Sequence, residues 1–250
     1  MIRRLLLTIL LLFSPVQAFG AWTVVSSICT FQTAGDGSPL TTGTIDTTGA
    51  SLIVLYAYNY DDGASATVSD SRSNTWQHLT DQVTFGYEGR LHYVYQPSAG
   101  SGHTFTLSRA DGVYQGVLCA LALTGSLTTD PADQQSSYGF ATYPTIQPGS
   151  ITPSLNNEIV ITGVGTNGQY NDAFSIDSGF TLQAQAYDTG GLIGHAGAIG
   201  YIVQGAASAV NPTWTINDCC GQVMSTSMAS FKPFVAPPAT LIKRRPVVTQ

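Results

Sequence analysis

Short apolar runs separated by turn residues extend along almost the whole of this 250-residue chain. The runs are rich in aliphatic, β-branched and aromatic residues, as in 52–58 and 117–124, and Gly, Asn, Asp or Pro interrupts them at short intervals. This pattern is typical of the strands of a sandwich or barrel. Charged residues make up only 10% of the chain and hydrophobic residues 43%, which excludes intrinsic disorder and argues against long amphipathic helices. The sequence therefore predicts an all-β protein.

The second half of the chain repeats the order of the first at a nearly constant distance. Two landmarks recur 107 positions later and two recur 108 positions later: Leu52 as Ile159, Asp70 as Asp177, Gln96 as Gln204 and His103 as Asn211. We interpret this as an internal duplication, with related halves at about residues 50–125 and 158–232, joined by a crossover over 130–153. Neither half could bury a sheet face alone, so we expect a single jelly-roll-like β-sandwich with pseudo-two-fold symmetry. Two separate small β domains are the alternative, but no Gly/Ser-rich linker separates the halves.

The two ends of the chain differ from this body. Residues 1–18 combine Arg3 and Arg4, an apolar run and the small residue Ala18, which is typical of a secretory signal peptide. An uncleaved anchor is the alternative, but the apolar run is short for a membrane-spanning helix. We expect cleavage after Ala18, a β-sandwich domain over residues 19–233 and a flexible basic tail over residues 234–250. The protein should then be secreted or held at the cell surface, with no membrane span after cleavage.

Charge is distributed unevenly between the predicted domain and its tail. Residues 19–231 contain all 15 acidic residues but only Arg72, Arg90 and Arg109, which gives a formal charge of −12. Residues 232–250 carry four basic residues and no acidic one. A body this acidic repels phosphate, so we expect no nucleic-acid partner for the folded part.

Five segments together resemble a known type of module. They are an apolar strand, an Asp-Ser-x-x-Asn-x-Trp turn, an aromatic strand, a Gly-His-Thr-x-Thr strand and an apolar strand that ends in Thr-Gly, here Leu52–Tyr58, Asp70–Trp76, Arg90–Gln96, Gly102–Thr106 and Val117–Gly125. Over about residues 20–233 the chain resembles the β-sandwich modules of secreted bacterial exoproteins and of some phage-associated chains. Those modules are mostly uncharacterised, and the resemblance implies adhesion or glycan binding. It supplies no catalytic residue.

Tyrosines gather on two of the expected strands. Side chains in a strand alternate between its faces, so the tyrosines of 56–60 share one face, and two more occupy 93–95. Aromatic faces stack on sugar rings, and nearby carboxylates and amides bind sugar hydroxyls. The candidate ligand-binding residues are therefore Tyr56, Tyr58, Tyr60, Asp61, Asp62, Tyr93 and Tyr95. The alternative is that this face is core, because Leu52 and Val54 share it.

We expect no cofactor and no metal ion. The Asp61-Asp62-Gly63 loop could bind Ca²⁺ together with Asp133 or Asp172, but it lacks the spacing of an EF-hand and a solvated turn is favoured. The four histidines, His78, His92, His103 and His195, show no close metal-ligand spacing.

The motifs of catalysis are also missing from the sequence. It has no Gly-x-Ser-x-Gly elbow. Glu88, Arg90 and His92 share a hairpin with Asp81, yet a surface ion pair explains Glu88 and Arg90 equally well. We interpret the four cysteines as structural: Cys29 and Cys119 lie in apolar strand patterns, and Cys219 and Cys220 lie in a turn.

These observations predict an exported, non-enzymatic binding or adhesion module whose partner is carbohydrate, such as a cell-surface glycan. A secreted glycan-active enzyme, either a hydrolase or a lyase, is one alternative. A structural component of a surface or a virion appendage is the other.

Overall fold

The computed structural model describes residues 19–32, 39–60, 66–80, 82–84, 86–109, 116–139, 144–167, 173–187, 195–216 and 223–236. These ranges contain seventeen β-strands and no helix. The first half of the chain supplies β1 (Thr23–Phe31), β2 (Leu40–Thr41), β3 (Leu52–Tyr60), β4 (Thr67–Asp70), β5 (Gln77–His78), β6 (Gln82–Thr84), β7 (Tyr87–Tyr95), β8 (Phe105–Ser108) and β9 (Gly116–Thr124). The second half supplies β10 (Ala132–Gly139), β11 (Thr145–Ile146), β12 (Glu158–Thr166), β13 (Phe174–Ile176), β14 (Thr181–Ala186), β15 (Ala196–Gln204), β16 (Trp214–Ile216) and β17 (Met224–Phe231).

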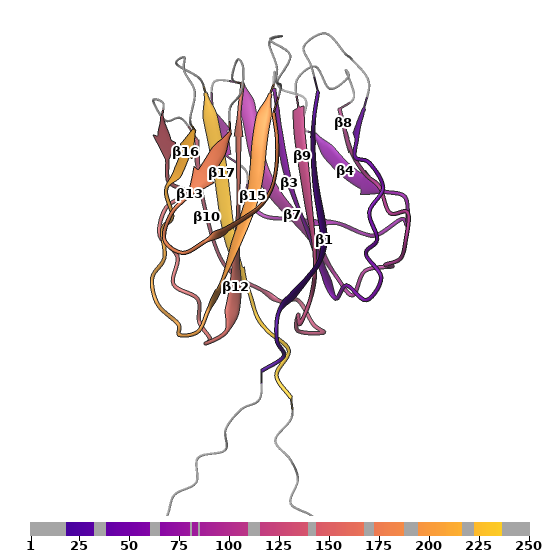
Figure 1. The fold of residues 1–250 in the computed structure, drawn as a ribbon, viewed down its shortest axis with the longest axis vertical. Helices are drawn as coiled ribbons and strands as arrows, with labels where there is room; N and C mark the ends of the chain where they lie inside the picture. Colours follow the sequence, from indigo (N-terminus) through magenta and orange to yellow (C-terminus); the bar gives the residue numbers. More distant parts are fainter. Residues whose placement is uncertain are drawn as a thin grey trace, which may run out of the picture.

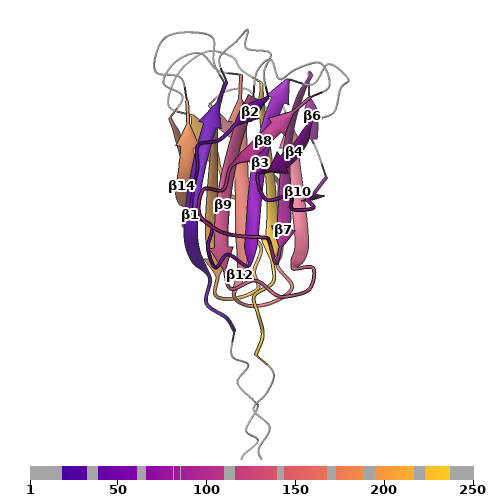
Figure 2. The same cartoon turned by 90° about the vertical axis from the view of Figure 1, so that its right-hand side faces the viewer.

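Two large antiparallel sheets face each other, each formed by one half of the chain (Figures 1 and 2). The first has the order β1-β9-β3-β7-β5, with β6 also paired to β7, and the second has the order β10-β17-β12-β15-β14. Two small sheets, β2-β8-β4 and β11-β16-β13, complete the architecture. The predicted all-β sandwich is confirmed.

Apolar side chains fill both faces of the central strands. On β3, Leu52 and Val54 point into the core between the two large sheets, whereas Ile53 and Leu55 point into a second core that also holds Leu107 of the small β2-β8-β4 sheet. A third core packs Trp214 and its neighbours from β11-β16-β13 onto the second large sheet. Because both faces of β3 and β12 are covered, most of their residues are apolar and the apolar residues do not alternate with exposed polar ones.

The two halves have the same strand order. Replacing β1, β9, β3, β7 and β5 by β10, β17, β12, β15 and β14 converts one large sheet into the other, and β2-β8-β4 corresponds in the same way to β11-β16-β13. The isolated bridge between Ile45 and His103 likewise has its counterpart between Ile151 and Val210. In each half the strands of the large and the small sheet are ordered as in a jelly roll. The space between these two sheets is filled by residues of the same half, so the expectation that neither half could bury a sheet face alone was wrong. A common origin of the halves would account for this correspondence and stays a prediction.

Both ends of the described chain lie side by side at one end of the sandwich (Figure 1). Phe19 forms a bridge with Val235, and the Gly20 amide donates to the Phe234 carbonyl at 2.7 Å. The paired part of the domain therefore extends to Val235, two residues beyond the predicted boundary at 233. The predicted signal peptide and residues 237–250 of the tail lie outside the described residues. Within the described ranges, no helix has the length and apolarity needed to cross a bilayer.

The segment predicted as a crossover contains two strands. Residues 132–139 form β10 at the edge of the second large sheet, and residues 145–146 form β11. Its four prolines, at 131, 144, 148 and 153, lie outside both strands, where a missing amide hydrogen costs no ladder bond. The interpretation of 130–153 as a plain connection was wrong.

Candidate functional site

Two of the predicted ligand-binding tyrosines are buried between the large sheets. Tyr56 and Tyr58 are fully inaccessible to solvent. Their hydroxyls donate to backbone carbonyls of the second half, Tyr56 to Ser225 at 2.7 Å and Tyr58 to Val223 at 3.1 Å. Burial raises the pKa of both hydroxyls, so both remain protonated donors. The prediction that this stripe is an exposed platform is wrong for these two residues, because the second large sheet covers the face they share.

The other predicted residues are dispersed. Tyr93 is buried, and its hydroxyl donates to the Asp130 carboxylate at 2.9 Å. Tyr95 is half-buried and lines a groove described below. The side chain of Tyr60, together with Asp61 and Asp62, lies outside the described residues.

The acidic residues named for Ca²⁺ give no support to that site. Asp172 lies outside the described residues, as do Asp61 and Asp62. Asp133 is paired with Lys232, whose Nζ lies 2.8 Å from Oδ1. That ion pair and a hydrogen bond from the Ser154 amide hold the pKa of Asp133 below its usual value against the opposing effect of burial. The carboxylate of Asp133 is therefore engaged in a structural contact.

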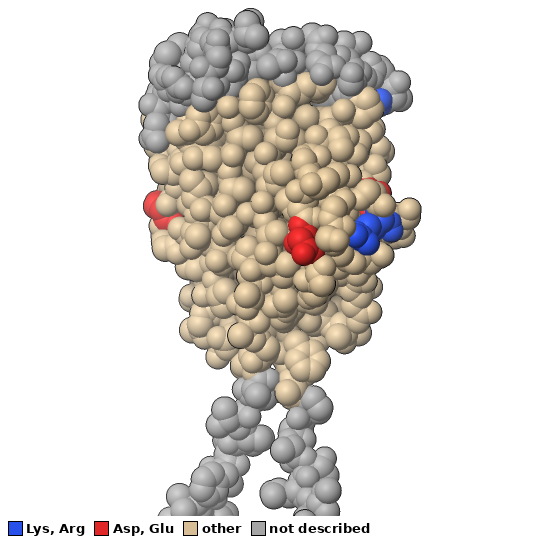
Figure 3. Space-filling model, turned by 45° about the vertical axis from the view of Figure 1, so that its right-hand side comes forward, with Lys and Arg blue, Asp and Glu red and all other residues tan. Residues whose placement is uncertain are grey.

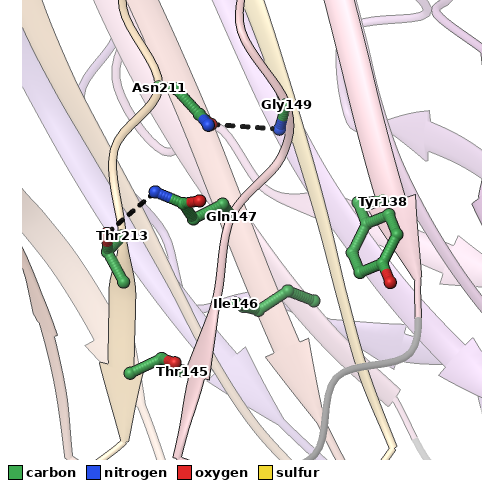
Figure 4. A pocket seen from close by; sticks show the side chains of 7 residues that line it. All are labelled: Tyr138, Thr145, Ile146, Gln147, Gly149, Asn211 and Thr213. Atoms are coloured by element: carbon green, nitrogen blue, oxygen red, sulfur yellow. Dashed lines mark hydrogen bonds between the residues drawn. The ribbon is translucent and has the colours of Figure 1, made fainter.

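A groove of about 590 Å³ on the second half carries an exposed aromatic ring. We call it the Tyr138 groove. Tyr138, on the edge strand β10, is 51% exposed, the largest exposure among the large hydrophobic side chains of the described chain. The groove is lined by Tyr138, Thr145, Ile146, Gln147, Gly149, Asn211 and Thr213. Figure 4 shows the Tyr138 ring on one side, with Ile146 and Gln147 across from it.

Hydrogen bonds fix the polar side chains of the Tyr138 groove. Gln147 Nε2 donates to Thr213 Oγ1 at 3.1 Å, and the Gly149 amide donates to Asn211 Oδ1 at 3.1 Å (Figure 4). Behind them, Ser136 Oγ donates to the Pro148 carbonyl at 2.7 Å. The Gln147 carbonyl oxygen and the Asn211 amino group can then accept from and donate to a ligand hydroxyl. The groove thus combines one aromatic ring with amide and hydroxyl groups, of which Gln147 and Asn211 are held by hydrogen bonds.

Among the described residues that line the Tyr138 groove, the tyrosine itself is the only ionisable one. Charge is also sparse on the face drawn in Figure 3, where most of the described surface carries neither a basic nor an acidic side chain. The groove therefore offers a ligand hydrogen bonds and stacking, with no ion pair.

A second groove, of about 360 Å³, lies on the first half where β7 ends. We call it the Tyr95 groove. It is lined by Ser73, Asn74, Thr75, Gln77, Val94, Tyr95 and Gln96. Most of these residues belong to two of the segments on which the family resemblance rests, Asp70–Trp76 and Arg90–Gln96.

The Glu88–Arg90 pair is inside the protein. Arg90 Nη2 lies 3.0 Å from Glu88 Oε1, and the two side chains are 15% and 4% exposed. His92, two positions further along the same face of β7, is also buried. The interpretation of Glu88 and Arg90 as a surface ion pair was therefore wrong. Taking two charges out of water is costly, so a buried pair indicates either a structural network or a functional site.

His103 and the pair Cys29 and Cys119 take structural positions. The His103 ring pairs through Nδ1 with Thr47 Oγ1 at 2.9 Å, and its Nε2 lies 3.3 Å from Asp70 Oδ1. Cys29 and Cys119 lie directly opposite each other on β1 and β9 and form a disulfide. Cys219 and Cys220 lie outside the described residues.

The Tyr138 groove had almost no signal in the sequence. Tyr138 follows the polar run 133–137, and its groove partners come from residues 145–149 and 211–213, which are more than 60 positions apart. The only available sign was an isolated tyrosine in an otherwise polar segment, and residues 130–153 were interpreted as a connection.

Comparison of the chain with protein-family models, with curated proteins and with solved structures finds no match.

Proposed function

We propose that the protein is an exported, non-enzymatic binding or adhesion module that binds carbohydrate through the Tyr138 groove. The observation that carries this proposal is a half-exposed tyrosine ring across an uncharged groove from fixed amide and hydroxyl groups. Sugar rings present an apolar C–H face and a rim of hydroxyls. A ring for the face and amides for the rim are the groups that such a ligand needs.

The preorganisation of the groove supports binding. Ordering a side chain on binding costs about 0.5–1.5 kcal/mol. Gln147 and Asn211 are already held by hydrogen bonds to Thr213 and Gly149, so a ligand need not order them. Tyrosine has few rotatable bonds, which keeps the cost of ordering its ring low.

Export is supported by two features of the chain. The first eighteen residues have the pattern of a secretory signal peptide. The disulfide between Cys29 and Cys119 is of the kind that persists in oxidising compartments. A glycan outside the cell is therefore a ligand that this protein would encounter.

Binding is tested by incubating the purified exported protein with cellulose, mixed-linkage β-glucan, xylan, mannan and alginate and measuring its depletion from solution. We expect retention on at least one neutral polymer. Tyr138→Ala should weaken that binding at least about tenfold, equivalent to roughly 1.4 kcal/mol, whereas Tyr138→Phe should retain most of it because the ring remains.

Phe234→Ala is the matched control, since Phe234 is 40% exposed and lies at the end of the molecule where the chain termini pair. It should bind as the unchanged protein does. If no polymer retains the protein, or if Tyr138→Ala binds normally, the proposed function is wrong.

A glycan-active enzyme is a second candidate, favoured by one observation. Glu88 is a buried carboxylate 3.0 Å from Arg90, and His92 follows on the same strand face. Carboxylates in such environments carry out acid and base steps in glycan cleavage. If this candidate is right, the protein releases new reducing ends from a bound polymer, and Glu88→Gln abolishes the release while retention on the polymer is unchanged.

A further inference from the structure

We infer that the Tyr95 groove is a second carbohydrate-binding site, which makes a single chain bivalent. This inference rests on the proposed function, because it assigns to the second groove the same class of ligand. It is carried by a different set of residues, on the other half of the molecule and in a different place on the fold.

The first wall of the Tyr95 groove is the turn that follows β4. Asp70 Oδ1 accepts from the Arg72 amide at 2.7 Å, and its Oδ2 accepts from Trp76 Nε1 at 2.8 Å. Ser73 adopts a left-handed backbone conformation, with φ of 57°. These hydrogen bonds to the ionised carboxylate lower the pKa of Asp70 below its usual value despite its burial, so the turn is fixed at neutral pH.

The second wall is the segment that leaves β7, and Asn74 joins the two walls. The Ser98 amide donates to Asn74 Oδ1 at 2.7 Å, and Asn74 Nδ2 donates to the Ser98 carbonyl at 3.3 Å. Arg72 Nη2 donates to the Ser101 carbonyl at 2.6 Å. The width of the groove is therefore set by side-chain bonds between two segments that are more than twenty residues apart in the chain.

The groups that face a ligand have the chemistry of the first groove. Tyr95 supplies a partly buried ring, and Thr75 and Gln77 supply an exposed hydroxyl and an exposed amide. Gln96 Nε2 donates to the Thr128 carbonyl at 2.7 Å, which leaves its carbonyl oxygen to accept. The described residues that line this groove likewise include no acidic or basic one.

The fold does not require the side chains of this groove, because different residues stand at the corresponding described positions of the second half. Tyr95 pairs with Leu52 and Val203 pairs with Ile159, so Val203 takes the place of Tyr95. The turn after β13 is shorter and has Gly179 and Phe180 in place of the Asn-x-Trp sequence. The aromatic and amide groups of the Tyr95 groove are thus additions to the common framework, as expected for a site.

Two sites on one chain have a measurable consequence. A protein with one site coats a polysaccharide, whereas a protein with two sites can join polymer strands. When both sites engage one polymer, the second binding event is intramolecular, so the apparent affinity for the polymer exceeds that of either site alone. The two grooves differ in residues and size, so we expect them to differ in affinity.

The test is calorimetric titration with the tetrasaccharide of whichever polymer retains the protein, cellotetraose for a β-glucan. We expect about two sites for the unchanged protein, one for Tyr95→Ala, one for Tyr138→Ala and none for the double variant. The unchanged protein should also precipitate the soluble polymer, and neither single variant should. Tyr95→Phe keeps the ring and should keep both sites.

Tyr95 packs partly against the central core, so its substitution needs a second variant at an exposed position. Gln77→Ala meets this need and should weaken the same site, with the unfolding temperature unchanged. The inference is overturned if the unchanged protein has one site that Tyr138→Ala removes and that neither Tyr95→Ala nor Gln77→Ala affects. The proposed function would then remain intact. Absence of any retained polymer overturns both.

Discussion

A tyrosine can be buried at low cost where its hydroxyl finds a hydrogen-bond partner inside the protein. Tyr56 and Tyr58 are buried because carbonyl groups of Ser225 and Val223 accept their hydrogen bonds inside the protein. Tyr138 lies on an edge strand, and half of its surface remains in solvent. The same amphipathic side chain thus serves as core in one place and as a candidate binding surface in another.

Acid should destabilise the protein through two histidines. Burial lowers the pKa of His92 and of His195 to about 3, from an ordinary value of 6.5. Both rings are neutral in the folded state, and their stabilisation is complete above pH 6.5 and is lost as the pH falls toward 3. One pKa unit corresponds to about 1.4 kcal/mol, so we expect each to lower the free energy of unfolding by about 2 kcal/mol between pH 6.5 and 5. Urea unfolding at pH 7 and pH 5 measures the loss.

His195→Phe isolates one contribution, because the His195 ring packs against Tyr58 and Tyr87 and neither of its nitrogens has a hydrogen-bond partner among the residues that the structure describes. The variant keeps a ring and removes the titration, so its stability should fall less between pH 7 and pH 5. An identical pH dependence for the two proteins would contradict the assignment.

The contact between β3 and β12 depends on complementary side-chain size. The rings of Tyr56 and Tyr58 on β3 lie against Gly163 and Gly165 on β12, and a Cβ atom at either glycine would overlap a ring. Glycine weakens a strand when it has no such role. The two corresponding strands of the two halves therefore differ: one carries the rings and the other leaves space for them.

Gly165→Ala should destabilise the protein by about 1–3 kcal/mol, because a methyl group inserted into a packed core forces the Tyr58 ring and the sheets to shift. Gly205→Ala is the matched control, since no atom lies within 4 Å of a Cβ built there, and it should change stability by less than about 0.5 kcal/mol. Denaturant unfolding of the three proteins measures both effects. Equal stability of the Gly165→Ala variant and the unchanged protein would show that the ring and the glycine are not in this contact.

At the scale of the whole molecule, each half completes the other. The core between the large sheets takes Leu91 and Val117 from the first half and Ile161 and Phe231 from the second. The two chain ends meet at one end of the sandwich, and the two grooves lie on different halves. If the exported protein were tethered by either terminus, the tether would leave from the end of the sandwich where the termini meet, and both grooves would lie on the body of the sandwich.

The disulfide should stabilise the whole fold, because it joins residues 90 positions apart and spans most of the first half. Loss of a native disulfide costs roughly 2–5 kcal/mol, so the Cys29→Ala, Cys119→Ala double variant should unfold at a clearly lower temperature. Cys219→Ser is a comparison variant that leaves this bond intact. Thiol titration of the unreduced, denatured protein should find no more than two reactive groups, and four would contradict the bond.

The amino-acid sequence by itself determined the fold class and many of the strands, and it predicted a duplication that stays a prediction. These features depend on local information: the period of apolar residues, the turn residues that interrupt it and the constant distance between landmarks such as Asp70 and Asp177. The predicted apolar strands at 52–58 and 117–124 lie within β3 and β9. The predicted turn over Asp70–Trp76 is also present, and the Asp70 carboxylate accepts the hydrogen bonds that hold it.

Only the tertiary structure decided which side chains are available to a ligand. Tyr56, Tyr95 and Tyr138 are the same kind of side chain on the same kind of element. Their surroundings are formed by distant parts of the chain: strand β12 covers Tyr56, whereas Tyr95 and Tyr138 border grooves. Alternation in a strand assigns residues to two faces but does not say whether a second layer covers one face or both. Here both faces of β3 are covered, so the tyrosine stripe became core, and the candidate site formed at strand β10, for which the sequence predicted only a connection.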